Sequence, residues 1–465
     1  MHQETITTLQ TAIGASSLSS DRFVEDAAGR IDFAGLLRGS SLFGRGDELE
    51  GRSVLLATTA QLTTASALIE LDGVARRIVL WLPDWPVEHL PYVIEAAEVD
   101  SVVSDRMIPD MDLSRSLYFC PCSRNLVPFD RNHKATHETE WILLTSGTTG
   151  RPKLVVHTLA SLTAAIESRG DSSSQVVWST FYDIRRYGGL QILLRAALTG
   201  ASLVLSNHEE PVADFLARAG SSGVTHISGT PSHWRRALMS PSAKLLNPEY
   251  VRLSGEAVDQ AILNSLRTTY PKARMVHAFA STEAGVAFEV RDGDAGFPAS
   301  TLKEDSRIEL KIEDNTLRIR SAGAARRYLG DGVPTLKDQT GFIDTADTVE
   351  LRDGRYYFTG RRDGVINIGG LKVYPEEVEA AINRHPDVQM CLVRAKKSPI
   401  TGALVVADVV LKTDSALGKG DSRAAQADIL QHCHELLAAH KVPVAIHIVS
   451  ELPIGDSGKV MRRNA

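Results

Sequence analysis

The chain has 465 residues, which at roughly 100 to 200 residues per domain corresponds to two to four domains. Apolar residues make up 43% of the chain and charged residues 23%, which is typical of a soluble globular protein and excludes a disordered or fibrous one. The 51 lysines and arginines stand against 57 aspartates and glutamates, a net charge of −6, so we do not expect a general nucleic-acid-binding protein.

Cysteine usage and hydropathy indicate the cellular compartment in which the protein is expected. The four cysteines are sparse and form no CxxC pair, so neither a disulfide framework nor a structural zinc site is predicted. The N-terminus has no basic stretch followed by an apolar one, and no run of about 18 apolar residues occurs. We therefore expect a cytoplasmic protein that does not bind a membrane, with reduced thiols at Cys120, Cys122, Cys391 and Cys433.

From residue 53 onward, short β-branched runs alternate with segments of helical spacing. Strands are predicted at 53–58 and 77–82, and the helix between them carries its apolar residues on one face over 62–69. Helical spacing over 87–97 and a strand at 101–104 repeat the pattern. Strands that alternate with helices predict parallel, doubly wound α/β layers.

The next segments continue these layers and then change character. Apolar runs at 141–144, 203–205 and 275–279 predict further strands. Between residues 305 and 358, short alternating runs replace the helical signal and predict a small antiparallel β region.

Composition marks a boundary near residue 363. After it we predict a helix opened by Pro375, strands at 388–394 and 403–411, and a second helix. The apolar face of this second helix is expected to consist of Ile429, Cys433, Leu436 and Leu437. We therefore divide the chain into an N-terminal domain, 1–362, and an α+β C-terminal domain of about 100 residues, 363–465.

The strongest motif is the segment LTSGTTGRPK at 144–153, directly after a predicted buried strand. Its glycines let the backbone approach a ligand, its hydroxyls and N–H groups can surround phosphate oxygens, and Lys153 adds a positive charge. The segment is not a Walker A loop, because Pro152 removes a donor where that motif begins a helix. The alternative interpretation is a flexible Ser/Gly/Thr linker.

With five further motifs in order, the sequence resembles the adenylate-forming superfamily of acyl-CoA synthetases, peptide-synthetase adenylation domains and luciferases. The six motifs lie at 145–153, 254–257, 279–285, 345–347, 360–379 and 452–463. The resemblance implies an α/β fold with a large multilayer N-terminal domain, built from two α/β sheets and a small β-barrel-like region. It also implies a small mobile α+β C-terminal domain.

The resemblance also implies that ATP, Mg²⁺ and coenzyme A are bound. The residues that match the family's nucleotide- and coenzyme-binding positions are Thr145, Ser146, Gly147, Thr148, Thr149, Gly150, Lys153, Gly255, Glu256, Ala257, Phe279, Ala280, Ser281, Asp347, Arg361 and Gly370. Family members usually carry Tyr-Gly where this chain has Phe279-Ala280. Phe279 could stack on adenine, and the alternative is a core residue at a strand end.

Thr282 and Glu283 match the catalytic turn of the family. The hydroxyl suits a phosphate and the carboxylate suits Mg²⁺, a cation that prefers one or two carboxylates together with phosphate oxygens. For the ribose diol the family uses the carboxylate at Asp347, in a Thr-Ala-Asp sequence that is usually Thr-Gly-Asp. Asp344 is the competing candidate, and its alternative role is that of a turn residue.

The end of the chain matches the mobile part of the family's machinery. Lys459 is the lysine that holds the carboxylate and the α-phosphate together, which neutralises and aligns two anions without proton transfer. Arg361 matches an arginine on the ribose or phosphate, and Asp363 matches the hinge, with a plain linker residue as the alternative. Gly370 lies in the segment that lines the pantetheine tunnel.

The acyl pocket departs most from the family pattern. Arg185 falls where many members have histidine, Tyr187 and Gly188 match the aromatic-glycine pair, and Thr230 and Ala278 are further predicted walls. A guanidinium in the pocket would favour a polar or acidic substrate group. The alternative is that Arg185 or Arg186 pairs with Asp183 on the outside of a helix.

Together these motifs predict an ATP-dependent ligase that activates a small carboxylic acid, aromatic or short-chain, as acyl-AMP and transfers it to coenzyme A. One alternative is a stand-alone adenylation enzyme that passes the acyl group to a carrier-protein thiol, an amine or another non-thiol nucleophile. A different class of alternative is a non-catalytic ATP-binding regulator, which the terminal lysine disfavours. We expect a monomer or a homodimer.

Overall fold

The computed structural model describes residues 6–16, 21–107, 117–129, 135–145, 151–167, 175–207, 209–303, 307–368, 371–398, 402–413, 415, 417 and 422–453. The chain divides into two compact units. Unit 1 consists of residues 1–228, 280–287 and 320–343, and unit 2 of residues 229–279, 288–319 and 344–465. No helix in the described part of the chain has the length and apolarity needed to cross a membrane.

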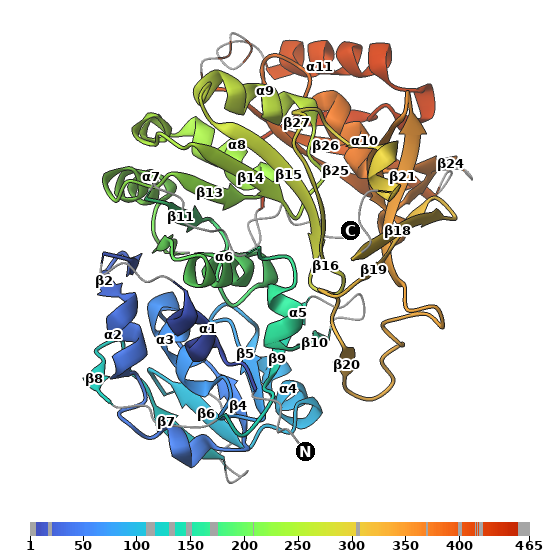
Figure 1. The fold of residues 1–465 in the computed structure, drawn as a ribbon. Coiled ribbons are helices and arrows are strands. Elements are labelled where there is room, and N and C mark those ends of the chain that lie inside the picture. The colour runs from blue at the N-terminus through green and yellow to red at the C-terminus, as the bar shows by residue number, and fades with distance from the viewer. Residues whose placement is uncertain are drawn as a thin grey trace. The chain divides into compact units, whose positions relative to one another are not determined.

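A seven-stranded sheet forms the larger layer of unit 1 (Figure 1). Its order is β20 (Arg327–Leu329), β10 (Lys153–His157), β9 (Glu140–Thr145), β5 (Arg77–Leu80), β4 (Ser53–Leu56), β6 (Ser101–Ser104) and β7 (Tyr118–Pro121). The five strands from β9 to β7 run parallel, and β10 is antiparallel to both of its neighbours. The predicted parallel layer is confirmed, and every residue of β4, β5 and β6 is buried, as expected for a parallel sheet that is covered on both faces.

Unit 1 also contains strands of a second parallel layer. β12 (Ser202–Leu205) pairs in parallel with β11 (Val177–Thr180) and with β1 (Phe23–Asp26), and β11 pairs in parallel with the first residues of β13 (His226–Gly229). β2 (Gly29–Asp32) closes a hairpin with β1. A short pair joins β3 (Gly39–Ser40) and β8 (Val127–Pro128).

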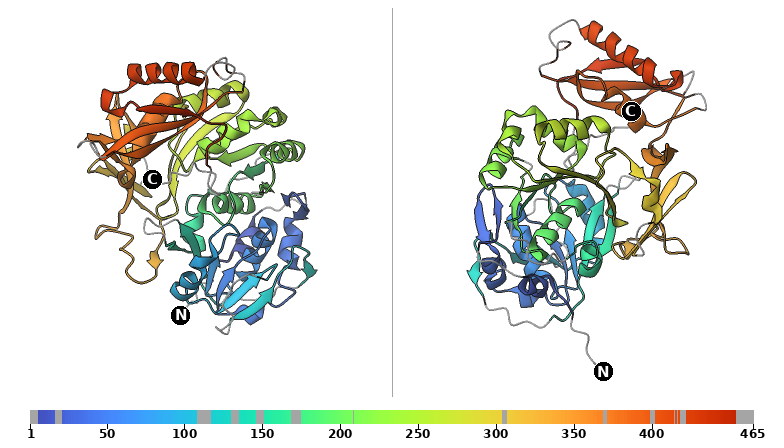
Figure 2. Two further views of the ribbon diagram at one scale, coloured as in Figure 1. Left: turned by 180° about the vertical axis from the view of Figure 1, so that it is seen from behind. Right: turned by 45° about the horizontal axis from the view of Figure 1, so that its top comes forward.

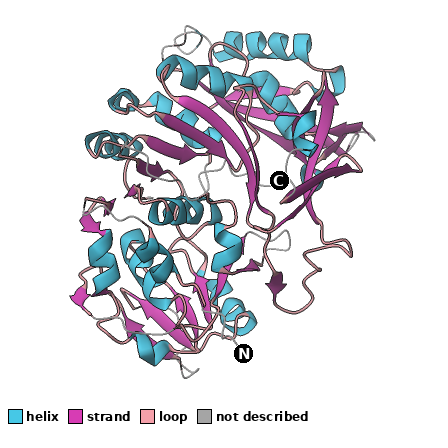
Figure 3. Cartoon of the chain, viewed as in Figure 1, coloured by secondary structure: helices cyan, strands magenta, loops and turns pink. Residues whose placement is uncertain are grey.

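Helices lie between many of the strands of unit 1, although β6 to β10 follow one another without an α-helix in the described residues (Figure 3). They are α1 (Leu9–Ala15), α2 (Phe33–Arg38), α3 (Gln61–Leu71), α4 (Leu90–Ala96), α5 (Leu159–Thr163), α6 (Tyr187–Leu198) and α7 (Val212–Ser221). The prediction of a one-sided helix over 62–69 is wrong, because every residue of α3 is buried. The helix packs against β1, α1 and α2, so protein covers it on all sides.

Unit 2 begins with a parallel pair and continues into an antiparallel sheet. β14 (Tyr250–Ser254) runs parallel to β15 (Arg274–Ser281), with helices α8 (Pro231–Met239) and α9 (Gln260–Thr269) in the same segment. β16 (Gly285–Val290) follows. The antiparallel region predicted for 305–358 is confirmed as a sheet in the order β17 (Phe297–Pro298), β22 (Arg355–Arg361), β21 (Ile343–Arg352), β19 (Thr316–Ser321) and β18 (Ile308–Glu313).

The last part of unit 2 is the predicted α+β arrangement (Figure 2). β23 (Ile366–Ile368) pairs with β24 (Leu371–Val373), and β25 (Val388–Ser398), β26 (Gly402–Leu411) and β27 (Ala445–Ile448) form a three-stranded sheet. Helices α10 (Pro375–Ile382) and α11 (Ser422–Leu436) share a core with this sheet through Ile382, Ile429 and Cys433.

The predicted apolar face of α11 needs one correction. Leu436 is 44% exposed, so its inclusion in the buried face is wrong, whereas Leu437 packs against the core. Leu436 is the final residue of α11, where the chain leaves the helix. All four cysteines are buried and free.

Candidate active site

The phosphate-loop motif connects two antiparallel strands. Thr145 ends β9 and lies opposite Lys153, which begins β10. The buried Oγ1 of Thr145 has no hydrogen-bond partner in the described part of the chain, and an orphaned hydroxyl of this kind fits a ligand oxygen. The connection leads into a strand and not into a helix, so the distinction from a Walker A loop is confirmed. Ser146, Gly147, Thr148, Thr149 and Gly150 lie outside the described residues, as do Gly370 and Lys459.

The turn that joins β15 and β16 is held from several sides. Ser281 Oγ accepts a hydrogen bond from Ala284 N at 3.0 Å. The Glu283 carbonyl accepts from Ala325 N at 2.8 Å, and the Ala284 carbonyl accepts from Ser321 Oγ at 2.9 Å. We call residues 281–285 the anchored turn, because these bonds fix its backbone.

The anchored turn presents the two predicted catalytic side chains, Thr282 and Glu283. The half-buried Glu283 carboxylate accepts one hydrogen bond among the described residues, through Oε1 from the Tyr328 hydroxyl at 3.3 Å. Its Oε2 therefore remains for a cation. No three described His, Cys, Asp or Glu side chains gather into a metal site, but a magnesium ion that shares its ligands with a nucleotide requires only one or two protein carboxylates. The residues present fit Mg²⁺ of that kind.

His157 contacts the same turn, and our sequence analysis did not identify it. Its Nε2 donates to the Thr282 carbonyl at 2.7 Å, and its Nδ1 lies 2.9 Å from Ser161 Oγ. Burial lowers the pKa of His157 to about 4, which the nearby Lys337 ammonium reinforces. The sequence signal that could have identified His157 is that a polar residue ends the otherwise apolar run of β10.

Tyr328 is a second residue that the sequence did not reveal. It lies on β20, opposite Val155 of β10. Its hydroxyl contacts Glu283, and its ring centroid lies 5.5 Å from the Lys153 ammonium nitrogen. Tyr328 therefore connects the start of β10 with the carboxylate of the anchored turn.

The ribose candidates have different surroundings. Asp344 Oδ1 accepts from Ala346 N at 2.9 Å, and Asp344 Oδ2 lies 2.9 Å from Arg362 Nη1. Asp344 lies on β21, where its side chain binds the backbone two residues on, so the choice between Asp344 and Asp347 stays a prediction. Asp347 lies 3.7 Å from Arg361 Nη1. Ala346 between them has a φ of +59°, in the left-handed region where the family pattern has glycine.

Arg361 also contacts the predicted hinge. Its Nε donates to Asp363 Oδ1 at 3.1 Å, and both side chains are largely exposed. An exposed pair of this type contributes little to stability. The contact can therefore break at small cost, and the hinge role of Asp363 stays a prediction.

Phe279 belongs to an aromatic cluster at the end of β15. Its ring is nearly parallel to those of Phe288 and Phe358, with centroids 5.8 and 5.2 Å away. Phe297 contacts both of these rings. The core contacts of the alternative interpretation are therefore present, and stacking on adenine stays a prediction.

The segment after β14 is joined to the start of α8. Gly255 has a φ of +85°, and the Glu256 carboxylate accepts from Ser232 N at 2.9 Å and from Ser232 Oγ at 3.0 Å. Thr230 is the N-cap of α8 and is fully buried. A negative charge at a helix N-terminus is favourable, so Glu256 fixes this segment. Ala278 lies buried on β15.

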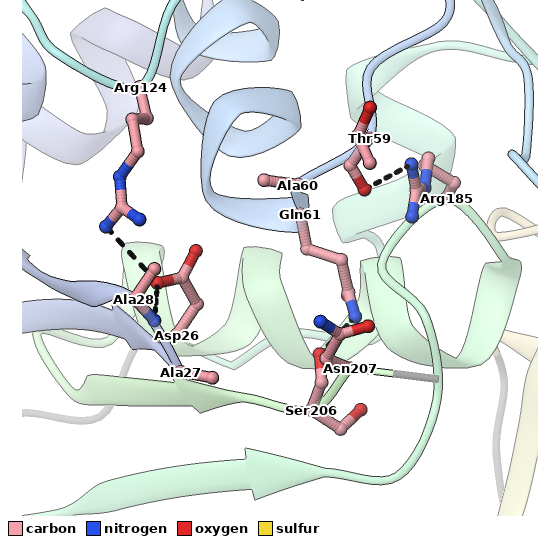
Figure 4. A pocket seen from close by; sticks show the side chains of 10 residues that line it. All are labelled: Asp26, Ala27, Ala28, Thr59, Ala60, Gln61, Arg124, Arg185, Ser206 and Asn207. Atoms are coloured by element: carbon pink, nitrogen blue, oxygen red, sulfur yellow. Dashed lines mark hydrogen bonds and ion pairs between the residues drawn. The ribbon is translucent and has the colours of Figure 1, made fainter. Parts of the chain in front are cut away.

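Arg185 lines a cavity of about 110 Å³ in unit 1 (Figure 4). It is only 1% exposed, its Nε donates to Asp183 Oδ1 at 2.8 Å, and its Nη1 donates to the Thr58 carbonyl. The alternative pairing with Asp183 is confirmed, but its placement on the outside of a helix is wrong, because Arg185 is buried and precedes α6. Since Asp183 neutralises Arg185, the argument for an acidic substrate group no longer holds.

The aromatic-glycine pair opens α6. Tyr187 is the first residue of that helix, and its ring lies 5.7 Å from the His157 ring. A Cβ on Gly188 would meet the Tyr182 ring at 3.3 Å, and one on Gly189 would lie 2.2 Å from the Asp183 carbonyl oxygen. The helix start thus requires glycine at 189, and whether Tyr187 and Gly188 contact a substrate stays a prediction.

Comparisons with known proteins agree with this geometry. Residues 73–325 match the model of the AMP-binding enzymes, and residues 377–459 match that of the AMP-binding enzyme C-terminal domain. A 2-succinylbenzoate–CoA ligase of Salmonella typhimurium is 30% identical over 331 residues, which cover 69% of this chain and 67% of the ligase.

Solved structures share the fold. A benzoate CoA ligase from Burkholderia xenovorans LB400 superposes with a TM-score of 0.81 at 18% identity, over 98% of this chain and 99% of that one. The amide bond synthetase McbA from Marinactinospora thermotolerans gives a TM-score of 0.77 at 17% identity, over 97% of both chains.

The fold is therefore that of the adenylate-forming enzymes, with their α/β layers and a small α+β part after them. The predicted fold class is confirmed. The two matched segments include more than half of the chain, and the chain belongs to the family of AMP-binding enzymes. It is an AMP-forming ligase.

Proposed function

We propose that the protein activates a small carboxylic acid with ATP, giving acyl-AMP and pyrophosphate, and then transfers the acyl group to the thiol of coenzyme A, releasing AMP. The anchored turn carries this proposal. It offers the Thr282 hydroxyl and Glu283 Oε2, which has no hydrogen bond among the described residues, beside β10, whose first residue is the loop lysine Lys153. This is a donor set for phosphate oxygens and a divalent cation.

In the first half-reaction the carboxylate oxygen attacks the α-phosphorus and pyrophosphate leaves. Thr282 contacts a phosphate oxygen, and Asp347 accepts hydrogen bonds from the ribose hydroxyls. Lys459 neutralises the carboxylate and the α-phosphate where they meet. When bound, Mg²⁺ held by Glu283 and phosphate oxygens neutralises the charge of the departing pyrophosphate.

The remaining ATP contacts follow from the matched motifs. The loop from Thr145 to Gly150 surrounds phosphates, and the segments 255–257 and 279–281 border the adenine. The orphaned Thr145 hydroxyl supports the first of these assignments. Arg361 contacts the ribose or a phosphate.

The second half-reaction requires the C-terminal domain, 363–465, to move relative to residues 1–362 about Asp363. Gly370 then lines the path of the pantetheine thiol, and Lys459 withdraws. The weak, exposed contact between Arg361 and Asp363 is compatible with such a movement.

We favour an aromatic or short-chain acid. The buried Arg185–Asp183 pair removes the reason to expect an acidic group on the substrate. The relative that acts on 2-succinylbenzoate and the benzoate ligase of the same fold support an aromatic acid. Tyr187, Gly188, Thr230 and Ala278 remain the proposed pocket walls.

Acid-dependent exchange of labelled pyrophosphate into ATP tests the first half-reaction and identifies the acid at the same time. We expect exchange with at least one aromatic or short-chain acid in the presence of Mg²⁺. Nucleotide binding without exchange across a broad acid panel would instead favour a non-catalytic regulator.

Lys459→Ala separates the two half-reactions. We expect it to abolish exchange and to leave thiolysis of supplied acyl-AMP largely intact, because the lysine serves only the first step. Equal loss in both steps would refute this role.

An amine is an alternative to coenzyme A as the acceptor of the acyl group, because one protein of this fold is an amide bond synthetase. Mass analysis of the products formed with coenzyme A, with a carrier protein and with amines distinguishes these acceptors. We expect a coenzyme A thioester, and formation of an amide alone would overturn that expectation.

A further inference from the structure

We infer that His157 is a positioning residue for the anchored turn, and that it acts by holding the Thr282 carbonyl from the end of β10. The inference rests on the proposed function, since it takes Thr282 and Glu283 to be the groups that hold ATP phosphate and a divalent cation. His157 itself touches no reacting atom in this account.

The hydrogen bonds of His157 define its ring orientation. A carbonyl oxygen can only accept, so Nε2 carries the hydrogen that reaches Thr282 O at 2.7 Å. In the neutral ring Nδ1 is then an acceptor, and it lies 2.9 Å from Ser161 Oγ, whose single hydroxyl hydrogen is shared between Nδ1 and the Thr158 carbonyl at 3.0 Å. Ser161 lies in the first turn of α5, in a capping box with Thr158. Both ring nitrogens are therefore in use, and the ring cannot turn without losing a bond.

Among the described residues, segment 321–325 also holds the backbone of the anchored turn. Ala325 and Ser321 bind the carbonyls of Glu283 and Ala284. Gly285, at a φ of +79°, packs so closely that a Cβ would lie 2.5 Å from the Gly323 carbonyl oxygen. Segment 321–325 thus holds the later half of the turn, and His157 holds the Thr282 peptide.

β10 connects this contact to the phosphate loop. The strand begins with Lys153 and ends with His157, and its neighbour β20 brings Tyr328 to the Glu283 carboxylate. One rigid pair of strands therefore sets the position of the loop lysine, the Thr282 backbone and the Glu283 side chain. When such supporting contacts are missing, the groups of a site can be displaced by about 1 Å, and a displacement of this size is enough to lower the rate of the catalysed reaction greatly.

Burial makes the contact with Thr282 difficult to replace. His157 has no exposed surface, and a leucine in its place supplies no donor, so the Thr282 carbonyl loses this hydrogen bond. An unpaired carbonyl would then draw the Thr282 peptide toward another donor. This movement displaces the hydroxyl and carboxylate that follow it.

The test compares His157→Leu with His157→Gln, whose amide N–H can reach the same carbonyl. Loss of a supporting contact behind a metal ligand typically costs about 10- to 100-fold. For the leucine variant we expect about a 30-fold lower kcat in pyrophosphate exchange, with the KM for the acid changed less than about threefold. We expect the glutamine variant to recover most of this loss.

A binding measurement tests the inference without any acid. Calorimetric titration of ATP is carried out with Mg²⁺ and with EDTA. In the leucine variant we expect the Mg²⁺-dependent gain in affinity to fall about tenfold, while affinity in EDTA stays near that of the unmodified protein. If the unmodified protein exchanges with no acid, the proposed function fails, but this titration still decides the role of His157.

His385→Leu is the matched control. His385 is also a buried histidine, 5% exposed, and its Nε2 lies 3.1 Å from Asp428 in the C-terminal part of the chain. We expect it to lower stability without changing exchange or the effect of Mg²⁺. An equal kinetic loss in this control would overturn the inference.

Ser161→Ala covers the case in which the leucine variant does not fold. It removes the hydroxyl beside Nδ1 and leaves the ring in place, and we expect about a fivefold smaller Mg²⁺-dependent gain in ATP affinity. The inference is overturned if this variant binds as the unmodified protein does. It is also overturned if His157→Gln loses as much as a folded His157→Leu.

Discussion

Ala346 occupies a backbone conformation that suits glycine better than alanine. Its φ is +59°, and for a residue with a Cβ the left-handed region costs roughly 1–2 kcal/mol. Ala346→Gly removes this cost but gives the unfolded chain more freedom, which offsets about 0.4–1 kcal/mol. The balance is a stabilisation of about 0.5–1 kcal/mol.

Urea unfolding followed by fluorescence measures this difference, with Ala395→Gly as the matched control. Ala395 is half-buried on β25 in regular strand geometry, paired with Val405. There the same chemical change should destabilise by about 0.5–1 kcal/mol, because glycine weakens a strand. Opposite signs at the two positions are expected. If Ala346→Gly also destabilises, the left-handed conformation is not the controlling cost.

Three further outcomes are expected. Asp347→Asn should weaken ATP binding in calorimetry by about tenfold, because the substitution removes a charged acceptor for the ribose hydroxyls. Asp344→Asn should change the ATP affinity less than about threefold. A larger loss in Asp344→Asn than in Asp347→Asn would assign the ribose to Asp344. Gly189→Ala should lower stability by more than about 2 kcal/mol, because its Cβ would lie 2.2 Å from the Asp183 carbonyl oxygen, while Gly14→Ala, where a Cβ meets nothing within 4 Å, should not destabilise in thermal unfolding. Burial raises the pKa of Asp72 to about 6, so this carboxyl binds its proton more tightly in the folded state than in the unfolded state. The contribution of Asp72 to stability therefore falls by about 3 kcal/mol as pH rises from about 4 to above 6. Urea unfolding across this range should show a smaller pH dependence in Asp72→Asn, and an unchanged profile would exclude Asp72 as the source of the pH dependence.

The layers and the nucleotide motifs could be predicted because their signals are local. The segments 53–58, 77–82 and 101–104 are short and mostly apolar, and the structure has β4, β5 and β6 there. The motif at 144–153 correctly indicated a loop that does not open a helix. Each of these inferences needed only residues that are neighbours in the sequence.

The contacts that complete the candidate site could not be predicted in this way. His157 and Thr282 are 125 positions apart, and Glu283 and Tyr328 are 45 apart. No periodicity encodes such pairs. The burial of Arg185 was missed for a related reason, since its neutralisation depends on how the chain turns between Asp183 and α6. The sequence predicted one buried face for α3, because the spacing of its apolar residues does not reveal that neighbouring elements also cover the opposite face of the helix.

Unit 1 is assembled from three separate stretches of chain, 1–228, 280–287 and 320–343. During synthesis, the first stretch leaves the ribosome about one hundred residues before the segment that supplies Ser321, Ala325 and Tyr328. A nascent chain can therefore form most of its parallel sheet while the backbone around Glu283 still lacks its partners. Non-local closure of this kind is slow, so the anchored turn would gain its partners late, after residue 343 has emerged. Truncated or stalled chains would contain the segment 145–153 without the contacts that complete the anchored turn.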